Sequence, residues 1–176
     1  MKFKICFLSS IFIIGLVYFI TLKVNSPEYA RSKAIKALAE KDYSKIFEML
    51  TKYEIEKCSL TETKVRRLLE PFDDLPQQMA EGKISLETDQ PVDRRVWKIS
   101  TKRHPQGVIV TVLYYKNEGW RFLLFDTAMS LYIQKEYPSW EKGGKAYRTK
   151  CAELAIPGYV QGNGEFVSYA EEERTN

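Results

Sequence analysis

The chain has 176 residues, of which 44% are hydrophobic and 13% aromatic, with 9 glycines and 7 prolines. This composition is typical of a folded protein and excludes intrinsic disorder. The formal net charge of +4 falls to +1 after residue 26, because three of the 27 Lys and Arg residues precede that point and all 23 Asp and Glu residues follow it. A nearly neutral domain argues against nucleic-acid binding, which needs a clustered basic surface.

An uncharged apolar run occupies residues 5–22, with lysines on both sides. As a helix this run would rise about 27 Å, close to the roughly 30 Å hydrocarbon thickness of a bilayer. A secretory signal has a shorter apolar region, and Pro27 would follow the nearest cleavage position. We therefore expect residues 1–26 to be a retained single-pass membrane anchor with the domain outside the cytoplasm. The alternative is secretion after signal cleavage.

Three helical segments are predicted after the anchor, over residues 27–42, 43–53 and 59–72. Asp42 can cap the second segment, and Ser59 with Glu62 forms the S-x-x-E capping box of the third. Apolar residues recur at helical spacing in each segment, such as Ala30, Ala34, Ala37 and Leu38, then Ile46, Leu50 and Tyr53, then Val65, Leu68, Leu69 and Phe72. We expect these apolar stripes to pack in a core.

From Glu81 onward the hydrophobic period changes to two, which predicts strands. Two short alternating runs contain Ile84 and Leu86, then Trp97 and Ile99. Two β-rich runs follow, GVIVTVLYYK (107–116) and GWRFLLFD (119–126), joined by a short turn. Helices followed by an antiparallel four-stranded meander predict the α+β class.

The C-terminal part returns to helix. Residues 127–138 form one predicted helical segment, with Thr127 as its cap, and residues 139–155 form a second that Gly143 and Gly144 weaken. A small hairpin is expected around residues 162–164, and residues 171–176 have the composition of a flexible, solvated tail. We expect residues 127–170 to be an extension of the same domain.

Two segments resemble the NTF2-like superfamily: AIKALAEKDYSKIFEML (34–50) and the strand pair YYKNEGWRFLLFD (114–126). They are similar to small exported or membrane-anchored bacterial members, over roughly residues 27–126. The resemblance implies helices packed on a curved antiparallel sheet, forming a cone with an internal pocket. Enzymes of this superfamily, such as ketosteroid isomerase, place Asp, Tyr or His side chains in that pocket. Residues 127–176 depart from the pattern, because the typical domain ends near its last strand.

Few residues are candidates for such a site. Strand ends carry Glu87, Tyr114, Tyr115 and Asp126, a polar loop carries the single histidine, His104, and a turn carries Asp73 and Asp74. We expect the two strand-end carboxylates, Glu87 and Asp126, to be solvated and His104 to be exposed. The basic residues Arg94, Arg95, Lys98, Lys102 and Arg103 are expected to guard a strand edge. The sequence therefore predicts no catalytic residue, no cofactor site and no metal site.

Cys58 and Cys151 are the two cysteines outside the apolar run. In an exported domain they can pair, and closing a loop of about 93 residues would stabilise the fold by roughly 4–5 kcal/mol. The alternative is two unpaired thiols. Neither cysteine lies in a C-x-x-C motif or beside the histidine, which disfavours zinc binding and thiol catalysis.

The function that fits these observations is a membrane-anchored extracytoplasmic binding or interaction module. Its partners would be membrane lipid around the N-terminal helix and either a small apolar ligand or another protein. The alternatives are a pocket enzyme of the NTF2-like type and a structural accessory subunit of an envelope complex. A cavity of about 300 Å³ or more with convergent polar groups would favour the enzyme. Aromatic residues after the sheet are expected to cover it, or else to form a platform for sugars or peptides: Tyr132, Tyr137, Trp140, Tyr147, Tyr159 and Tyr169.

Overall fold

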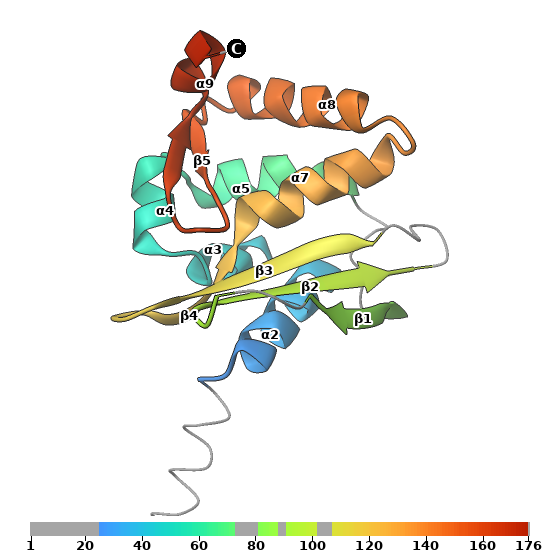
Figure 1. The fold of residues 1–176 in the computed structure, drawn as a ribbon, viewed down its shortest axis with the longest axis vertical. Coiled ribbons are helices and arrows are strands. Elements are labelled where there is room, and N and C mark those ends of the chain that lie inside the picture. Colours follow the sequence, from blue (N-terminus) through green and yellow to red (C-terminus); the bar gives the residue numbers. More distant parts are fainter. Residues whose placement is uncertain (1–24, 73–80, 88–90, 102–106, 176) are drawn as a thin grey trace, which may run out of the picture.

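The computed structural model describes residues 25–72, 81–87, 91–101 and 107–175, and these form an α+β fold. A four-stranded antiparallel sheet has helix α2 (Pro27–Ala39) on one face and helix α7 (Leu124–Lys135) on the other. Helix α8 (Trp140–Glu153) packs on the outer side of α7 and makes a further layer (Figure 1). The predicted fold class is confirmed at this level.

The sheet is the predicted meander. Its strands are β1 (Lys83–Leu86), β2 (Arg94–Ser100), β3 (Val108–Tyr115) and β4 (Gly119–Leu123), in the order β1-β2-β3-β4. Tyr115 pairs with Gly119 across the β3–β4 turn, where Gly119 has a φ of +73° that favours glycine. Strand β4 is an edge strand, and its Phe122 N–H donates to the carbonyl of Met49 at 3.1 Å. That bond covers part of the exposed edge.

The described chain before the sheet contains α2, α3 (Tyr43–Glu48), α4 (Lys52–Lys57) and α5 (Glu62–Leu69), with the 3-10 turn η1 (Glu70–Phe72) after α5. Asp42 caps α3 as predicted, its carboxylate accepting from the Lys45 N–H at 3.0 Å. The prediction of a single helix over 43–53 was wrong. Thr51 accepts a hydrogen bond from the Glu54 N–H at 2.9 Å and starts a separate helix there, because its hydroxyl competes with the helical backbone pattern.

Two other predicted caps differ from those in the structure. Thr61 caps α5, accepting from the Lys64 N–H at 3.2 Å, whereas Ser59 lies in the preceding turn at a φ of +51°. Helix α7 begins at Leu124 directly after β4, so Thr127 lies inside it and Asp126 lies in its first turn. The chain therefore passes from strand to helix without a loop.

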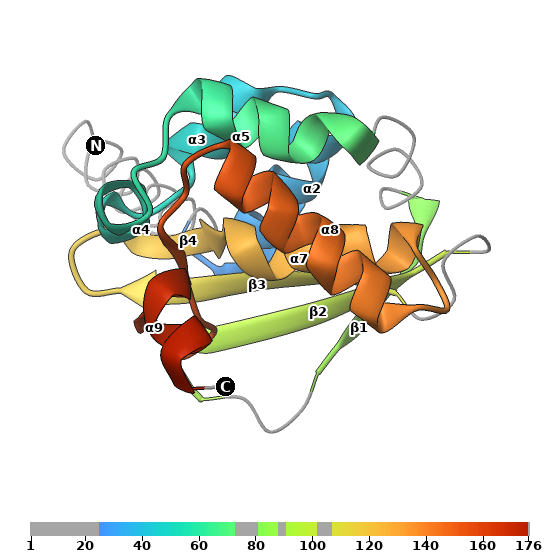
Figure 2. The ribbon, with the colours of Figure 1, turned by 90° about the horizontal axis from the view of Figure 1, so that it is seen from above.

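The C-terminal segment folds against the rest of the domain. Strands β5 (Gly158–Val160) and β6 (Phe166–Ser168) form the predicted hairpin, and helix α9 (Tyr169–Thr175) follows it (Figure 2). We predicted a flexible tail from residue 171, but the structure continues α9 through most of it. Arg148 of α8 and Glu172 of α9 form an ion pair at 2.8 Å that holds the two helices together.

Within the described residues, no helix is long and apolar enough to cross a bilayer. The apolar run at residues 5–22, on which the predicted membrane anchor rests, lies outside these residues. Only the last residues of the predicted anchor segment, Asn25 and Ser26, are described, and Ser26 caps α2 by accepting from the Tyr29 N–H at 3.1 Å. The anchor stays a prediction.

Candidate functional site: a pocket between the sheet and α7

A partly open pocket of about 490 Å³ lies between the sheet and α7, near the end of the sheet where β1 and β2 pair. Its lining residues come from β2, β3, α7, the start of α8 and the residues next to β1 and β3: Glu87, Arg94, Val96, Lys98, Gly107, Ile109, Asp126, Met129, Ser130, Ile133, Gln134 and Trp140. Apolar side chains form its walls and a few polar groups converge on it. This size and composition are typical of small-molecule sites.

Strand alternation and helix periodicity bring these side chains together. Arg94, Val96 and Lys98 lie at every second position of β2 and so share one face of the sheet. Ile109 of β3 pairs with Lys98 and lies on the same face. The α7 residues of the lining recur at spacings of three and four, which places them on the side of the helix that faces the sheet.

Ser130 ties α7 to the sheet at the pocket. Its hydroxyl accepts from the Ile109 N–H at 3.1 Å and donates to the Thr127 carbonyl at 2.9 Å. Strand β4 pairs with β3 only from Thr111 onward, so the Ile109 N–H has no strand partner on that side. A helical side chain therefore takes the place of the missing strand, which fixes the height of α7 above the pocket floor.

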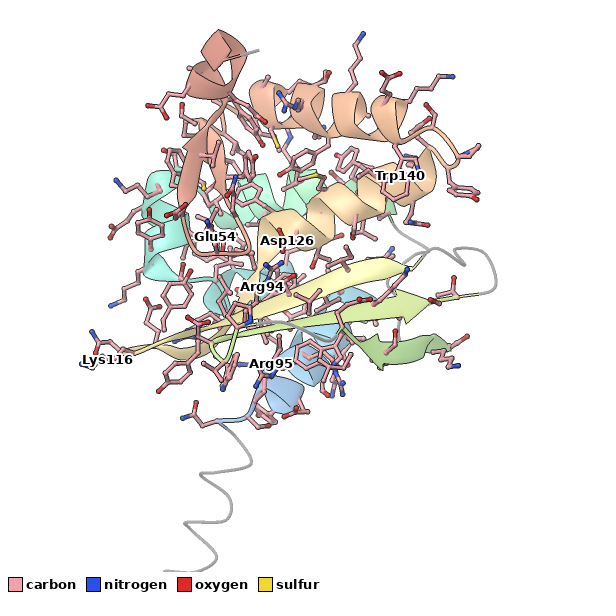
Figure 3. The ribbon with its side chains drawn as sticks, in the orientation of Figure 1. Glu54, Arg94, Arg95, Lys116, Asp126 and Trp140 are labelled. Carbon is pink, nitrogen blue, oxygen red and sulfur yellow. The ribbon has the colours of Figure 1, made fainter. Side chains whose placement is uncertain are left out.

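Asp126 is the central polar group of the site. Its carboxylate accepts a hydrogen bond from the Thr111 hydroxyl at 2.7 Å and lies 3.9 Å from an Arg94 guanidinium nitrogen. Its side chain is 21% exposed. Burial raises the pKa of Asp126, and the Thr111 hydrogen bond and the Arg94 charge partly oppose that rise. Figure 3 shows Asp126 above Arg94 at the base of α7.

Arg94 connects the pocket to the C-terminal hairpin. A Cβ atom placed on Gly162, in the β5–β6 turn, would lie 2.4 Å from the Arg94 guanidinium carbon. The turn therefore packs against the Arg94 guanidinium, and a larger residue at position 162 would have to displace the end of that side chain. Within the described part of the chain, the buried Nε of Arg94 has no hydrogen-bond partner. The hairpin thus holds Arg94 in place while its Nε–H remains available to donate a hydrogen bond.

A second carboxyl lies behind the pocket, at the N-terminus of α7. Glu54 is fully buried, and its carboxyl accepts from the Leu124 N–H at 3.2 Å. Burial raises the pKa of Glu54 to about 8, and the nearby Asp126 charge adds to the rise. The sequence contains one signal of this arrangement, a T-x-x-E pattern from Thr51 to Glu54 that marks a helix start. We missed that signal, and it does not reveal the contact with Leu124.

The sequence candidates lie in three different places. Asp126 and Glu87 both line the pocket, so the expectation that Asp126 is a solvated strand-end carboxylate was wrong. It sits in the first turn of α7, covered by the sheet. Tyr114 lies exposed on the α2 face, with its ring 5.5 Å from that of Trp120. Tyr115 is half-buried near Glu54, and burial raises its pKa to about 12.

His104, Asp73 and Asp74 lie outside the described residues. The predicted basic cluster divides between two faces of the sheet: Arg94 and Lys98 line the pocket, whereas Arg95 lies toward α2 (Figure 3). The cluster does more than guard an edge, because two of its members supply the positive charge of the site. Lys102 and Arg103 are outside the described residues.

The aromatic residues after the sheet do not form one surface within the described chain. Tyr132 and Tyr147 are buried, with ring centroids 5.8 Å apart between α7 and α8. Tyr159 and Tyr169 pack on each other at 5.6 Å beside the hairpin. Trp140 is 62% exposed at the rim of the pocket. Most of this set therefore builds the C-terminal layer.

Cys58 and Cys151 are both buried free thiols in the structure. Burial raises the pKa of each, and the Cys151 thiol adds to the rise at Cys58. Their pairing stays a prediction. Among the described residues no group of three or more His, Cys, Asp or Glu side chains could hold a metal ion.

Comparison with known proteins adds no relative to this description. No protein-family model, no curated protein and no solved structure matches the chain. The resemblance to the NTF2-like superfamily therefore rests on the two sequence segments alone, and the site is defined by its own geometry.

Proposed function

We propose that this protein is a membrane-anchored binding module that holds a small amphipathic ligand in the pocket between the sheet and α7. The observation that carries the proposal is the pocket itself: about 490 Å³, apolar walls, and Arg94, Lys98 and Asp126 around it. Its volume falls within the range of roughly 300–1,000 Å³ usual for small-molecule sites. The apolar run at residues 5–22 supports an anchored, extracytoplasmic location.

The walls suit an apolar ligand body. Val96, Ile109, Met129 and Ile133 line the pocket, and Val96 is 5% exposed. Trp140 stands at the rim with most of its ring free, in a position to stack on a planar ligand. A flat ring system of one or two rings fits this shape and chemistry.

The polar groups favour a ligand with one anionic group. Lys98 has no ion pair among the described residues, and Arg94 meets Asp126 only at 3.9 Å. A ligand carboxylate between Lys98 and Arg94 would complete the coordination of both cations with charge-assisted hydrogen bonds. Such a ligand would be oriented with its ring toward Met129 and its anion toward β2.

The NTF2-like family remains our proposal for the ancestry of the domain. Helices on an antiparallel sheet with a pocket at one face are compatible with it. One wall of the pocket, however, is formed by α7, which lies almost wholly outside the range 27–126 that carries the resemblance. If the family is right, the C-terminal extension supplies one wall of the pocket.

The test is ligand binding by the full-length chain, measured by saturation-transfer NMR and calorimetry. Indole-3-acetate is the probe and indole-3-acetamide its neutral counterpart. We expect the acid to bind at least about tenfold more tightly, because charge-assisted hydrogen bonds are the stronger class. Met129→Trp should fill the pocket and abolish binding, whereas Val92→Trp, at a position 87% exposed, should leave it unchanged. Equal binding by both variants would refute the site.

A second candidate function, a pocket enzyme, is favoured by the volume of the pocket with its convergent polar groups, and by Asp126 among them. A carboxylate with a raised pKa in a largely apolar pocket is a plausible general base. The test is deuterium exchange at the carbons beside the carbonyl of cyclohexanone, followed by NMR in D2O. Exchange that Asp126→Asn abolishes would support the enzyme. Deuterium exchange no faster than in buffer without protein would contradict the enzyme and leave ligand binding as the function.

A further inference from the structure

Asn25, just before α2, lies against the tip of the β3–β4 hairpin. A Cβ atom placed on Gly119 would lie 2.9 Å from the Asn25 side-chain oxygen, so the two residues are in direct contact. Asn25 also shares a small recess with Tyr29, Trp120 and Arg121. The start of α2 and the hairpin therefore form one surface, here called the Asn25 face. It lies at the end of the molecule opposite α8 and α9 (Figure 1).

The length of the connection decides where this face would lie relative to a membrane. Two residues, Lys23 and Val24, separate the end of the apolar run at Leu22 from Asn25, and the three Cα–Cα steps between Leu22 and Asn25 span at most about 11 Å. The headgroup layer on each side of the hydrocarbon core is about 5–8 Å deep. With residues 5–22 in the bilayer, as the proposed function assumes, the Asn25 face lies at or within the headgroups.

The aromatic residues of the Asn25 face suit that position. Tyr29 and Tyr114 are each 42% exposed, and Trp120 is half-buried beside Tyr114. Tyr and Trp concentrate at membrane interfaces, because one end of each ring system is apolar and the other forms hydrogen bonds.

Positive charge exceeds negative charge on the same face. Lys33 and Arg121 line the recess together with the carboxylate Glu118. Arg95 lies over the Trp120 ring, and Lys116 lies at the hairpin tip (Figure 3). Glu118 is already paired with Arg121 at 3.7 Å. Lys33 and Lys116 have no ion pair within the described chain. Figure 3 shows Lys116 projecting at the hairpin tip and Arg95 beside α2, both away from the α8 layer.

From this combination we propose that the Asn25 face docks on an anionic lipid surface, so that the domain lies against the membrane. The proposal rests on the anchor of the proposed function. Each Lys or Arg near an anionic surface strengthens attachment about fivefold, so two unpaired lysines bias the domain toward the docked orientation. Docking on this side leaves Trp140 and the α7–α8 layer directed away from the lipid.

The experiment uses the full-length chain in lipid nanodiscs that contain a nitroxide-headgroup lipid, which quenches tryptophan fluorescence at short range. We expect strong quenching that Trp120→Phe reduces by at least about half, because Trp120 would lie among the headgroups. Trp140→Phe should leave the quenching unchanged. Replacing phosphatidylcholine by phosphatidylglycerol should increase the quenching, and 0.5 M salt should reverse that increase.

A pair of charge variants identifies the face. Lys33→Glu with Lys116→Glu should reduce quenching in phosphatidylglycerol at least about twofold. The matched control, Lys142→Glu with Lys145→Glu, reverses two exposed lysines on α8 and should change nothing. A quenching signal independent of lipid charge and of both pairs overturns docking. A chain that fails to associate with nanodiscs of either lipid overturns both the anchor and docking, whereas pocket binding of indole-3-acetate is measured separately.

Discussion

The Glu54 carboxyl accepts a hydrogen bond from the backbone N–H of Leu124, the first residue of α7, at a distance of 3.2 Å. Helix α7 has no capping side chain of its own, because the chain enters it directly from β4. A carboxyl 70 residues earlier in the chain therefore satisfies a terminal N–H. This contact fixes the start of the helix that carries Asp126, Met129 and Ser130 into the pocket.

Glu54 should make the stability of the protein fall as pH rises. In the unfolded chain its pKa is 4.5, and in the folded protein burial raises it to about 8. Between these values the folded state keeps a proton that the unfolded state has lost, so the free energy of unfolding declines by up to roughly 1.4 kcal/mol per pH unit. The stabilisation is complete below pH 4.5 and lost above about pH 8. Urea unfolding at pH 5 and pH 8.5 measures the difference.

The variant that isolates this effect is Glu54→Gln, since an amide oxygen can still accept from Leu124 but carries no charge. It should match the wild type at pH 5 and exceed its stability at pH 8.5. Glu56→Gln, an exposed position on the same helix, should leave the pH dependence intact. A wild-type profile that is flat over this range would show that Glu54 is already ionised in the folded protein.

Thr111→Val should raise the pKa of Asp126 further. The Thr111 hydroxyl donates to the Asp126 carboxylate at 2.7 Å and is a cause that lowers this pKa, so its removal leaves burial less opposed. Valine keeps the shape of the buried side chain. Carbon-detected NMR titration of the Asp126 carboxyl reads the change directly. Thr127→Val is the control, because within the described residues the Thr127 hydroxyl has no hydrogen-bond partner.

Gly143→Ala and Gly144→Ala should have opposite effects on stability. A Cβ on Gly143 would lie 2.5 Å from the Cα of Ile133 and 2.9 Å from the carbonyl oxygen of Tyr132, and neither backbone atom can rotate away. Forcing α8 from α7 should cost about 1–3 kcal/mol. Gly144 has nothing within 4 Å, so alanine there should gain about 0.5–1 kcal/mol from helix propensity. Thermal unfolding of both variants tests the pair, and equal shifts would contradict the packing.

Cys58 and Cys151 should resist alkylation in the folded, reduced protein. Both thiols are buried, and burial raises the pKa of each, so little thiolate is present at neutral pH. Iodoacetamide treatment at pH 8 followed by peptide mass spectrometry should find neither modified until urea is added. Rapid labelling of the native protein would mean that the C-terminal layer opens readily.

The predicted Cys58–Cys151 disulfide has a separate test. Protein isolated without reductant from an oxidising compartment should yield a linked pair of peptides on digestion, and the pair should separate with dithiothreitol. Only linear peptides would exclude the bond. Cys151→Ser should then lower the thermal midpoint more in the oxidised than in the reduced sample, because the buried hydroxyl costs stability in both but the chain-entropy contribution is lost only in the oxidised one.

The sequence by itself determined the order and type of most elements. Two β-rich runs joined by a short turn predicted the β3–β4 pair, and Asp42 predicted the start of α3, because these features depend on local chemistry within a few residues. The break at Thr51 was also local, but the apolar spacing that continued through Tyr53 concealed it. Local residues also predicted the glycine-rich turn at residues 162–164, which joins β5 and β6.

Only the tertiary structure decided the site. Asp126 looked like the solvated end of a strand, and it became a pocket carboxylate because β4 passes into α7 without a loop and turns that position toward Thr111. Arg94 and Arg95 are adjacent in the chain, yet strand alternation directs one to the pocket and the other to the α2 face. Glu54 acquires its role from a contact with Leu124. Burial and long-range contacts set these properties, and neither is encoded in the spacing of nearby residues.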